Sequence, residues 1–358
     1  KEYAHALCVD LTKAFDCVSH SLLLKKLAYY NLDNSCIKLL ESYLHERKQF
    51  VHFNNVNSSC LTVQQGVPQG SVLGLILFLI FINDLPDCAH DTNFILYADD
   101  TTLIATSPNL KTLQSNISIV ELSVNAWFIS NRLCLNNEKT KQIYFGLRDL
   151  EIINNNEPVQ LLGVLFDSKM TWEVHITQLA KTVSQRLYVM RRLQHIVSTS
   201  TIKTAYFGYI HSKICYAILV WGHSCHLYKL FAIQRKCVRI MSKLNYRDDC
   251  RNAYKRLGIM TVPSIYIFSC LLYAKRNSDQ FRGLDHVYDT RHKSLLQPEF
   301  LRLSRTRNGI RFFCHQLFNS LPLTLKDKSY ASFRFCVKTL LIENVFYSLE
   351  EFVKFNFR

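Results

Sequence analysis

The chain has 358 residues, a formal net charge of +15 at pH 7 and 48% hydrophobic residues. Its length excludes a single small core and favours two or three subdomains. The positive charge is typical of a protein with a phosphate-rich partner, although a basic protein can instead bind a membrane surface or be merely cationic.

The thirteen cysteines show no paired Cys-x-x-Cys spacing, and we interpret them as reduced thiols of an intracellular protein. His223, Cys225 and His226 are close in sequence, but no second half of a zinc site follows, so we interpret them as a coincidence. No signal peptide is visible. The apolar run from Val72 to Ile82 is too short for a bilayer, which needs about 20 residues, and predicts a buried helix.

The first expected element is an apolar strand over Ala6–Val9 that ends at Asp10. An amphipathic helix is predicted from Val18 to Tyr29, because its apolar residues recur at spacings of three to five. A Gly-rich loop from Gln65 to Gly74 then leads into the Val72–Ile82 helix. Glycine permits positive φ and close approach to a ligand, and a helix that starts there would point its amides at an anion. The alternative is a tight turn before a buried helix.

The segment Phe94–Ile104 predicts two apolar strands joined by a turn that carries Asp99 and Asp100. Two adjacent carboxylates repel each other, and burial of an unpaired charge costs several kcal/mol. A cation such as Mg²⁺ would neutralise them. With Asp10 they would provide three carboxylates, the minimum for two-metal phosphoryl transfer. The alternative is an ordinary Asp-Asp turn, since aspartate favours turns.

The rest of the chain is predicted to be mainly helical. Expected helices cover Leu110–Leu133, Ile176–Leu193, a segment capped at Ser198–Ser200, Leu230–Leu244, and a pair over Arg251–Arg276 broken at Pro263. Short strands are expected over Gln142–Phe145 and Gln160–Phe166 around a turn at Asn154–Asn156. A loop-rich stretch over Asp285–Leu301 precedes a basic cluster of Arg302, Arg305, Arg307 and Arg311.

Several ordered motifs resemble the polymerase palm of reverse transcriptases, in particular those of LINE-type, jockey-like non-LTR retrotransposons. These motifs are Asp10–Asp16, Gly66–Gly74, Phe81–Pro86, Tyr97–Asp100, Leu135–Thr140 and Leu162–Asp167. A series of ordered motifs is far more specific than any one of them.

The resemblance implies an α+β fold with three parts. A palm, built from an antiparallel sheet with packed helices, is expected over residues 1–170 and a helical thumb over 171–247. A mainly helical, basic C-terminal region of unknown role would cover 248–358. The chain begins at Lys1, next to the first palm motif, so we expect an N-terminally truncated fragment whose fingers region is missing.

The resemblance also implies roles for individual residues. Asp10, Asp99 and Asp100 would be catalytic metal ligands for two Mg²⁺ ions, with Mn²⁺ as the alternative. Lys139 would act near the leaving pyrophosphate as a general acid or charge stabiliser, unless it is a solvated loop lysine. The expected dNTP-binding residues are Leu11, Phe15, Gln69 and Gly70.

Within this set, the Leu11 carbonyl would complete one coordination shell, and Phe15 would exclude a ribose 2′-hydroxyl, unless it is a core phenylalanine. Asp16 is expected to be structural. Nucleic-acid contacts are expected from Tyr97, which would pack beside the primer end unless it simply sits on the sheet. They are also expected from basic thumb residues: Arg191, Arg192, Arg235, Lys236 and Arg239. For most of these the alternative is a solvated helix face.

The function that the resemblance implies is RNA-directed DNA polymerisation. The partners would be an RNA template, a DNA primer and dNTP, with no membrane and no lipid anchor. The location would be intracellular, in nucleus and cytoplasm, as an element ribonucleoprotein. The alternative is a catalytically inactive, nucleic-acid-binding remnant of such an element.

Overall fold

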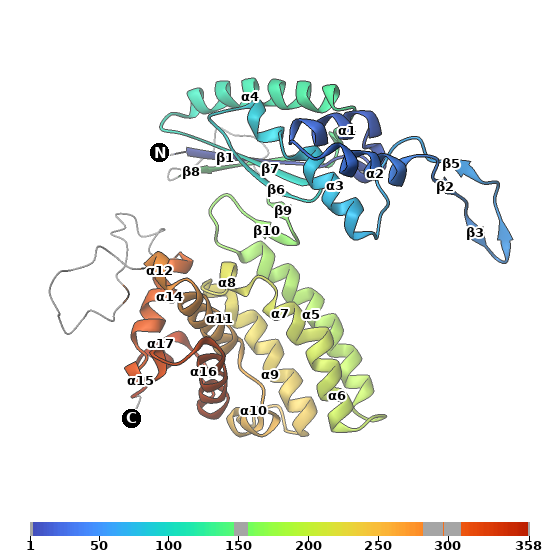
Figure 1. Cartoon of the computed structure of the whole chain (residues 1–358). Helices are drawn as coiled ribbons and strands as arrows, with labels where there is room; N and C mark the ends of the chain where they lie inside the picture. Colours follow the sequence, from blue (N-terminus) through green and yellow to red (C-terminus); the bar gives the residue numbers. More distant parts are fainter. Residues whose placement is uncertain (1–2, 147–156, 282–295, 297–308, 357–358) are drawn as a thin grey trace. The chain divides into compact units, whose positions relative to one another are not determined.

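The computed structural model of the chain describes residues 3–146, 157–281, 296 and 309–356. The chain divides into two compact units, Lys1–Met170 and Thr171–Arg358. The first unit contains the β-sheet and the second is helical (Figure 1).

A four-stranded antiparallel sheet forms the centre of the first unit. Its strand order is β6 (Asn93–Tyr97), β7 (Asp100–Ser107), β1 (Tyr3–Val9) and β8 (Lys141–Gly146). The predicted strand before Asp10 and the predicted Asp99–Asp100 hairpin are both confirmed. Strand β1 lies between β7 and β8, with Leu7 opposite Leu103 and Gln142.

Helices cover one face of this sheet. They are α1 (His20–Tyr29), α2 (Asn34–Leu44), α3 (Val72–Ile82) and α4 (Leu110–Ser130), with short 3-10 turns η1 (Ala14–Cys17) and η2 (Leu85–Cys88). Leu7, Val9 and Leu103 of the sheet share one buried cluster with Phe78 and Phe128 of these helices. Alternate strand residues face opposite sides of a sheet. Ala6 and Ile143 therefore lie on the other face, where they pack against Val159.

Helix α3 has the predicted bounds, but the expectation that it is buried is wrong for one side. Leu77, Phe78 and Phe81 are buried, whereas Val72 is 81% exposed and Ile76 is 46% exposed. A helix that is apolar all round gives no sequence signal for which face is covered.

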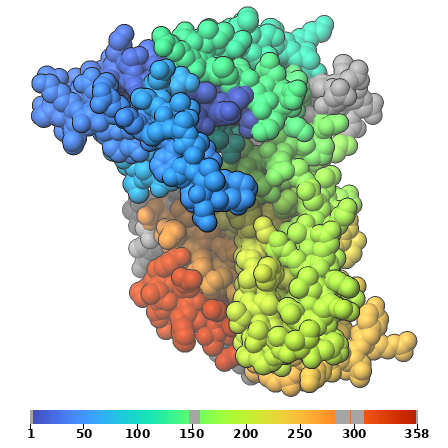
Figure 2. Space-filling view, turned by 90° about the vertical axis from the view of Figure 1, so that its right-hand side faces the viewer, coloured from blue at the N-terminus to red at the C-terminus, as the bar shows by residue number. Residues whose placement is uncertain are grey.

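Two smaller ladders complete the first unit. An arm between α2 and α3 contains β2 (Lys48–Gln49) paired with β5 (Leu61–Thr62), and β3 (His52–Phe53) paired with β4 (Val56–Asn57). Figure 2, viewed from the side to which the arm points in Figure 1, shows its side chains in light blue on the outer surface. Strands β9 (Val159–Leu161) and β10 (Val164–Phe166) form the other ladder. The predicted Asn154–Asn156 turn lies outside the described residues.

The first part of the second unit confirms the predicted helices. These are α5 (Glu173–Leu193), α6 (Thr199–Tyr206) and α9 (Tyr228–Ser242). The Ser198 side chain caps α6 by accepting a hydrogen bond from the Thr201 amide, which satisfies a free N–H of the first turn. Between α6 and α9 lie short elements that the sequence did not reveal: the π-helical turn η3 (Phe207–His211), α7 (Ser212–Cys215), α8 (Ile218–Trp221) and η4 (Cys225–Leu227).

The second part contains α10 (Arg251–Leu257), α11 (Val262–Arg276), α12 (Ser278–Phe281), α14 (Ile310–Asn319), α15 (Leu323–Lys326), α16 (Tyr330–Asn344) and α17 (Leu349–Val353). The predicted pair of helices over Arg251–Arg276 is confirmed, but the break covers residues 258–261 rather than Pro263 itself. Pro263 occupies the first turn of α11, where the missing N–H of proline removes no intrahelical bond. The predicted loop over Asp285–Leu301 lies outside the described residues except for Leu296, as do Arg302, Arg305 and Arg307.

A buried polar hub holds the second unit together. Gln234 of α9 is fully buried, donates to the Tyr206 hydroxyl and the Met260 carbonyl, and accepts from Tyr254 and the Val262 amide. Full satisfaction matters because each unpaired buried polar group costs about 1–3 kcal/mol. Among the described residues, no single helix is long and apolar enough to cross a membrane; α10 and α11, bent by 55°, pass as a pair on length and composition alone.

Candidate active site

The three predicted catalytic carboxylates lie at one end of the sheet. Strand β1 ends at Val9, which is paired with Thr101, so Asp10 follows at the level of Asp100 on the neighbouring strand. Asp99 lies in the two-residue turn of the β6–β7 hairpin, where Tyr97 is paired with Asp100. Ala98 occupies the other turn position with φ +52°. The sheet register thus places Asp10 beside Asp99 and Asp100, which lie nearly ninety positions further along the chain, as the sequence predicted.

The charges of these carboxylates act on one another. Partial burial raises the pKa of Asp100, and the negative charges of Asp99 and Asp10 raise it further. Lys139 places its Nζ 3.8 Å from an Asp10 oxygen, and its side chain is 71% exposed. A lysine this exposed contributes little to stability, but it provides a mobile positive charge at the carboxylates.

The segment that bears Lys139 is anchored to Asp10 by its backbone. The Asn136 amide donates to the Asp10 carbonyl at 2.9 Å, and the Asp10 amide donates to the Thr140 hydroxyl at 3.5 Å. The Thr140 hydroxyl in turn donates to the Asn136 carbonyl. Thr140 was not singled out from the sequence, because nothing in its spacing marks a contact with a residue so distant along the chain.

Leu11 continues this anchoring in an isolated bridge with Leu135. The flanking bonds, from Asn136 to Asp10 and from Thr12 to Cys134, identify it as a non-hydrogen-bonded pair. In such a pair, the N–H and C=O groups of both residues point away from the partner strand. The Leu11 carbonyl therefore faces away from Leu135.

The Gly-rich loop is fastened to the turn that follows Asp10. The Gly66 amide donates to the Val18 carbonyl and the Val67 amide to the Phe15 carbonyl, both at 2.8 Å. Gly66 has φ +93°, and a Cβ there would lie 2.8 Å from the Asp16 carbonyl oxygen. The loop can approach this closely only because residue 66 lacks a side chain.

Gln69 donates a hydrogen bond to Asp16 at 2.9 Å. Both side chains are exposed, so a ligand can compete for the Gln69 amide. Gly70 has φ +80° and open space around it. Asp16 was expected to be structural, and this hydrogen bond identifies it as the residue that holds Gln69.

The loop ends in a well-formed helix start. Ser71 caps α3 by accepting from the Gly74 amide at 2.9 Å and donates to the Pro68 carbonyl at 2.9 Å. A Cβ at Gly74 would lie 2.2 Å from that carbonyl oxygen. The glycine therefore fixes the loop against the first turn of α3.

Phe15 lies half-buried in η1, beside the same loop. Its ring packs on Phe78 of α3 with a centroid distance of 4.4 Å. This contact gives the ring a fixed position, which suits a steric gate and a core phenylalanine equally well.

The predicted nucleic-acid contacts occupy different settings. Tyr97 is 64% exposed beside the Ala98–Asp99 turn, and Arg191, Arg192 and Lys236 are exposed on α5 and α9. Arg235 and Arg239 are only partly exposed. Arg235 lies over the Phe231 ring at 5.0 Å, and Arg239 donates to the Asp248 carbonyl.

The carboxylate donor set fits a divalent cation. All three side chains offer hard oxygen ligands, which Mg²⁺ prefers, and their mutual repulsion at Asp100 is what a cation would relieve. In the described ranges, no three His, Cys, Asp or Glu side chains are already arranged to hold a metal ion. This finding covers Asp10, Asp99 and Asp100, whose donor chemistry but not their present arrangement suits a cation. It also covers His223, Cys225 and His226, and all thirteen cysteines are free thiols.

Comparisons with known proteins show similar sequences over much of the chain. Residues 1–166 match the family model described as reverse transcriptase (RNA-dependent DNA polymerase). The chain is 26% identical over 330 residues to a probable RNA-directed DNA polymerase from transposon BS of Drosophila melanogaster, covering 84% of this chain and 34% of that protein. It is 27% identical over 263 residues to the RNA-directed DNA polymerase from mobile element jockey of the same species, covering 68% and 29%.

The chain thus spans about a third of the length of the curated relatives it matches. Among solved structures, apo telomerase from Candida tropicalis matches with a TM-score of 0.40 and 14% identity, covering 72% of this chain and 45% of that one.

Proposed function

This chain belongs to the reverse transcriptases of non-LTR retrotransposons, and we propose that its first unit carries out RNA-directed DNA synthesis at Asp10, Asp99 and Asp100. The observation that carries the proposal is the sheet register, which aligns Asp10 with Asp100 beside the Asp99 turn. In the reaction, a primer 3′-hydroxyl attacks the α-phosphorus of a deoxynucleoside triphosphate, and pyrophosphate leaves.

Asp10, Asp99 and Asp100 would hold divalent cations, which in such sites stabilise the attacking and leaving oxygens. We propose two Mg²⁺ ions, with the Leu11 carbonyl as a further oxygen ligand because it faces away from its bridge partner. The raised pKa of Asp100 supports this assignment, since a site that repels its own negative charge gains from a cation.

The Gly-rich loop would position the incoming nucleotide. Gln69 would exchange its hydrogen bond with Asp16 for one to the nucleotide, and the open space at Gly70 would admit the nucleotide close to the backbone. Phe15, fixed by Phe78, would leave no room for a ribose 2′-hydroxyl and offer it no hydrogen-bond partner.

Lys139 would protonate the leaving pyrophosphate. Its Nζ already lies 3.8 Å from an Asp10 oxygen, and its exposed side chain can turn to a phosphate within reach. A protonated amine in this position stabilises the developing negative charge and supplies a proton.

The layout we propose is a palm over residues 1–170, a thumb over 171–247 and a C-terminal region over 248–358. Tyr97 would lie beside the primer end. Arg191, Arg192 and Lys236, which are exposed, are the proposed phosphate contacts of the thumb. Arg235 and Arg239, which are partly buried, would add phosphate contacts through the exposed part of their guanidinium groups. Phosphate contacts of this kind carry little sequence information.

Primer extension on an RNA template tests the proposal. The chain and a longer polypeptide that includes any residues encoded upstream of Lys1 are each given Mg²⁺, a DNA primer and all four deoxynucleotides. Extension by either protein supports the proposal. Absence of extension by both, with duplex binding retained, overturns it in favour of a binding protein without catalysis.

A further inference from the structure

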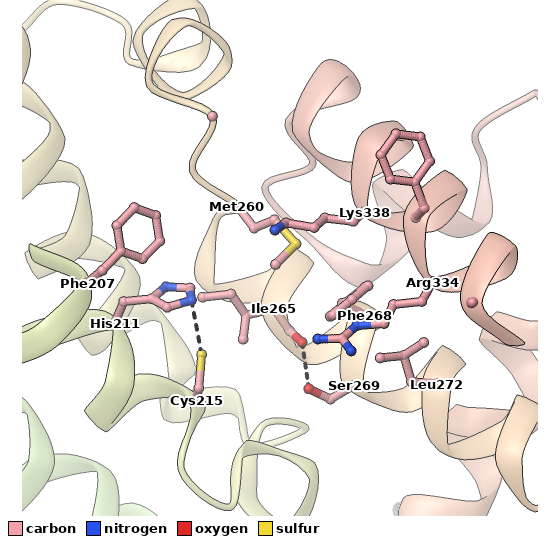
Figure 3. Close-up of a pocket in the computed structure, with 13 residues that line it drawn as sticks. Phe207, His211, Cys215, Met260, Ile265, Phe268, Ser269, Leu272, Arg334 and Lys338 are labelled. Carbon is pink, nitrogen blue, oxygen red and sulfur yellow. Dashed lines mark hydrogen bonds between the residues drawn. The ribbon is translucent and has the colours of Figure 1, made fainter. Parts of the chain in front are cut away.

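A pocket in the second unit lies between α11, α16 and the segment from η3 to α7 (Figure 3). Its volume is about 560 Å³, within the range of about 300–1,000 Å³ that is usual for small-molecule sites. Three phenylalanines contribute to its walls: Phe207 from η3, Phe268 from α11 and Phe335 from α16. Phe335 is 72% exposed, so its ring is accessible from solvent.

Among the described residues, the charged side chains that line the pocket are Arg334 and Lys338, one turn apart on α16, and none of the lining residues is an aspartate or glutamate. Figure 3 shows both side chains extending from α16 toward the helices of the opposite wall. Within the described part of the chain, neither has a hydrogen-bond or ion-pair partner, so both are available to an anion.

His211 faces this basic pair from the other wall. Its Nε2 lies 3.3 Å from the Cys215 sulfur, whereas its Nδ1 is buried and has no hydrogen-bond partner among the described residues. Burial lowers the pKa of His211 to about 4, and the charge of Lys338 lowers it too. The neutral His211 ring therefore has one buried nitrogen without a hydrogen-bond partner among the described residues. Such unpaired buried polar atoms are rare in native proteins.

The element that supplies Phe207 and His211 is a π-helical turn. Such turns are rare and occur frequently at functional sites, because the wider turn displaces side chains from their regular positions. Here it brings an aromatic ring and an imidazole, with centroids 4.9 Å apart, to the same wall.

We propose that this pocket binds a nucleotide unit, with the base against the phenylalanines and the phosphate between Arg334 and Lys338. Aromatic side chains beside cationic ones are the usual means of holding an unpaired base and its phosphate. The nucleotide can come from a free mononucleotide or from an unstacked position in a single strand, and the test separates these sources.

This inference goes beyond the proposed polymerase function. The pocket lies wholly in the second unit, whereas the three carboxylates lie in the first. Loss of synthesis in an Asp99 variant would therefore leave pocket binding intact, and loss of pocket binding can be measured without synthesis.

The test measures equilibrium binding of the full chain by fluorescence anisotropy. The probe is a labelled single-stranded RNA of about eight nucleotides, within the site sizes of about 4–16 nucleotides seen for such proteins. A second probe has the same backbone but abasic sugars, and adenosine monophosphate serves as a competitor. Phe335→Ala removes the exposed ring without changing charge, and Tyr188→Ala, at a 62% exposed tyrosine of α5, is its control.

We expect Phe335→Ala to weaken binding of the base-bearing RNA about fivefold or more, the loss typical of one stacked base, and to leave abasic binding unchanged. Arg334→Gln with Lys338→Gln should weaken both probes more than Lys255→Gln with Arg256→Gln, an equal loss of charge at exposed α10 positions. Competition by adenosine monophosphate identifies a free nucleotide as the ligand, and its failure to compete identifies the strand. Equal binding of both probes by the wild-type chain, or no effect of Phe335→Ala, overturns the proposal.

Discussion

Replacement of Gly66 by alanine tests how tightly the Gly-rich loop is fastened to the catalytic turn. The new Cβ would lie 2.8 Å from the Asp16 carbonyl oxygen and 2.9 Å from the Asp16 Cα. These are backbone atoms, so no side chain can move aside. The positive φ of +93° adds strain of about 1–2 kcal/mol for a residue with a Cβ.

Forced overlap in a packed site costs about 1–3 kcal/mol. Together with the strain, the free energy of unfolding of the first unit should fall by about 3 kcal/mol, less about 0.4–1 kcal/mol recovered because alanine restricts the unfolded chain. Gly70→Ala is the matched control. Its φ is +80°, but nothing lies within 4 Å of the new Cβ, so only the strain of about 1–2 kcal/mol applies.

The assay is a urea titration of the full chain read by pulsed hydrogen exchange. Peptides from β1 and β7 then report the first unit alone, which matters because a chain of two units need not unfold in one step. Gly66→Ala should shift the midpoint of these peptides to lower urea by more than Gly70→Ala does, and leave peptides from α9 and α11 unchanged. Equal shifts in the two variants would refute the reasoning, because the contact with Asp16 is what distinguishes them.

Three further predictions follow from named contacts. Asp100→Asn should raise the stability of the first unit at pH 7 and have no effect well below the ordinary aspartate pKa. The pKa of Asp100 is raised in the folded state, so ionisation of this carboxyl at pH 7 destabilises the fold, and asparagine removes that cost. Urea titrations at both pH values check this, and a gain in stability at acid pH alone would contradict it. Lys26→Met should lower the stability of the first unit by about 2 kcal/mol, because Lys26 donates to the Phe81 carbonyl at 2.7 Å and to Asp84 at 2.6 Å. Lys25→Met, at an exposed neighbour, is the control in the same titration. Equal losses in the two variants would show that the bonds of Lys26 to Phe81 and Asp84 do not stabilise the unit. Phe15→Val should allow incorporation of ribonucleotides, measured as the ratio of ribo- to deoxynucleotide addition, and an unchanged ratio would remove Phe15 from the sugar gate.

The parts of the site that local pattern determines were predictable from the sequence. The strand before Asp10 and the strands of the hairpin at Asp99 are apolar up to the aspartates that end them. The pairing register of β1 with β7 follows from which of their residues face the core. The helices α4, α5 and α9 follow from stripes at helical spacing. The N-cap at Ser198 follows from its chemistry.

The parts of the site that depend on contacts between distant polar residues were not predictable from the sequence. The bond from the Gln69 side chain to Asp16 and the bond from the Asp10 amide to the Thr140 hydroxyl involve exposed or half-exposed residues that no periodicity marks. The exposed face of α3 was hidden because every position of that helix is apolar or glycine. The pocket walls come from η3, α11 and α16, and only the tertiary structure brings these segments together.

The rate of primer extension by Asp99→Asn tests the central claim most directly. Asparagine keeps the size of the side chain but removes the charge that a divalent cation needs, and Asp91→Asn, at an exposed aspartate of the same unit, is the matched control. Both variants are compared with the unmodified protein on an RNA template with Mg²⁺. They are made in whichever polypeptide extends primers, the chain itself or the longer polypeptide that includes residues encoded upstream of Lys1. The account predicts loss of synthesis in Asp99→Asn alone, with duplex binding retained; synthesis at the rate of the Asp91→Asn control would contradict it.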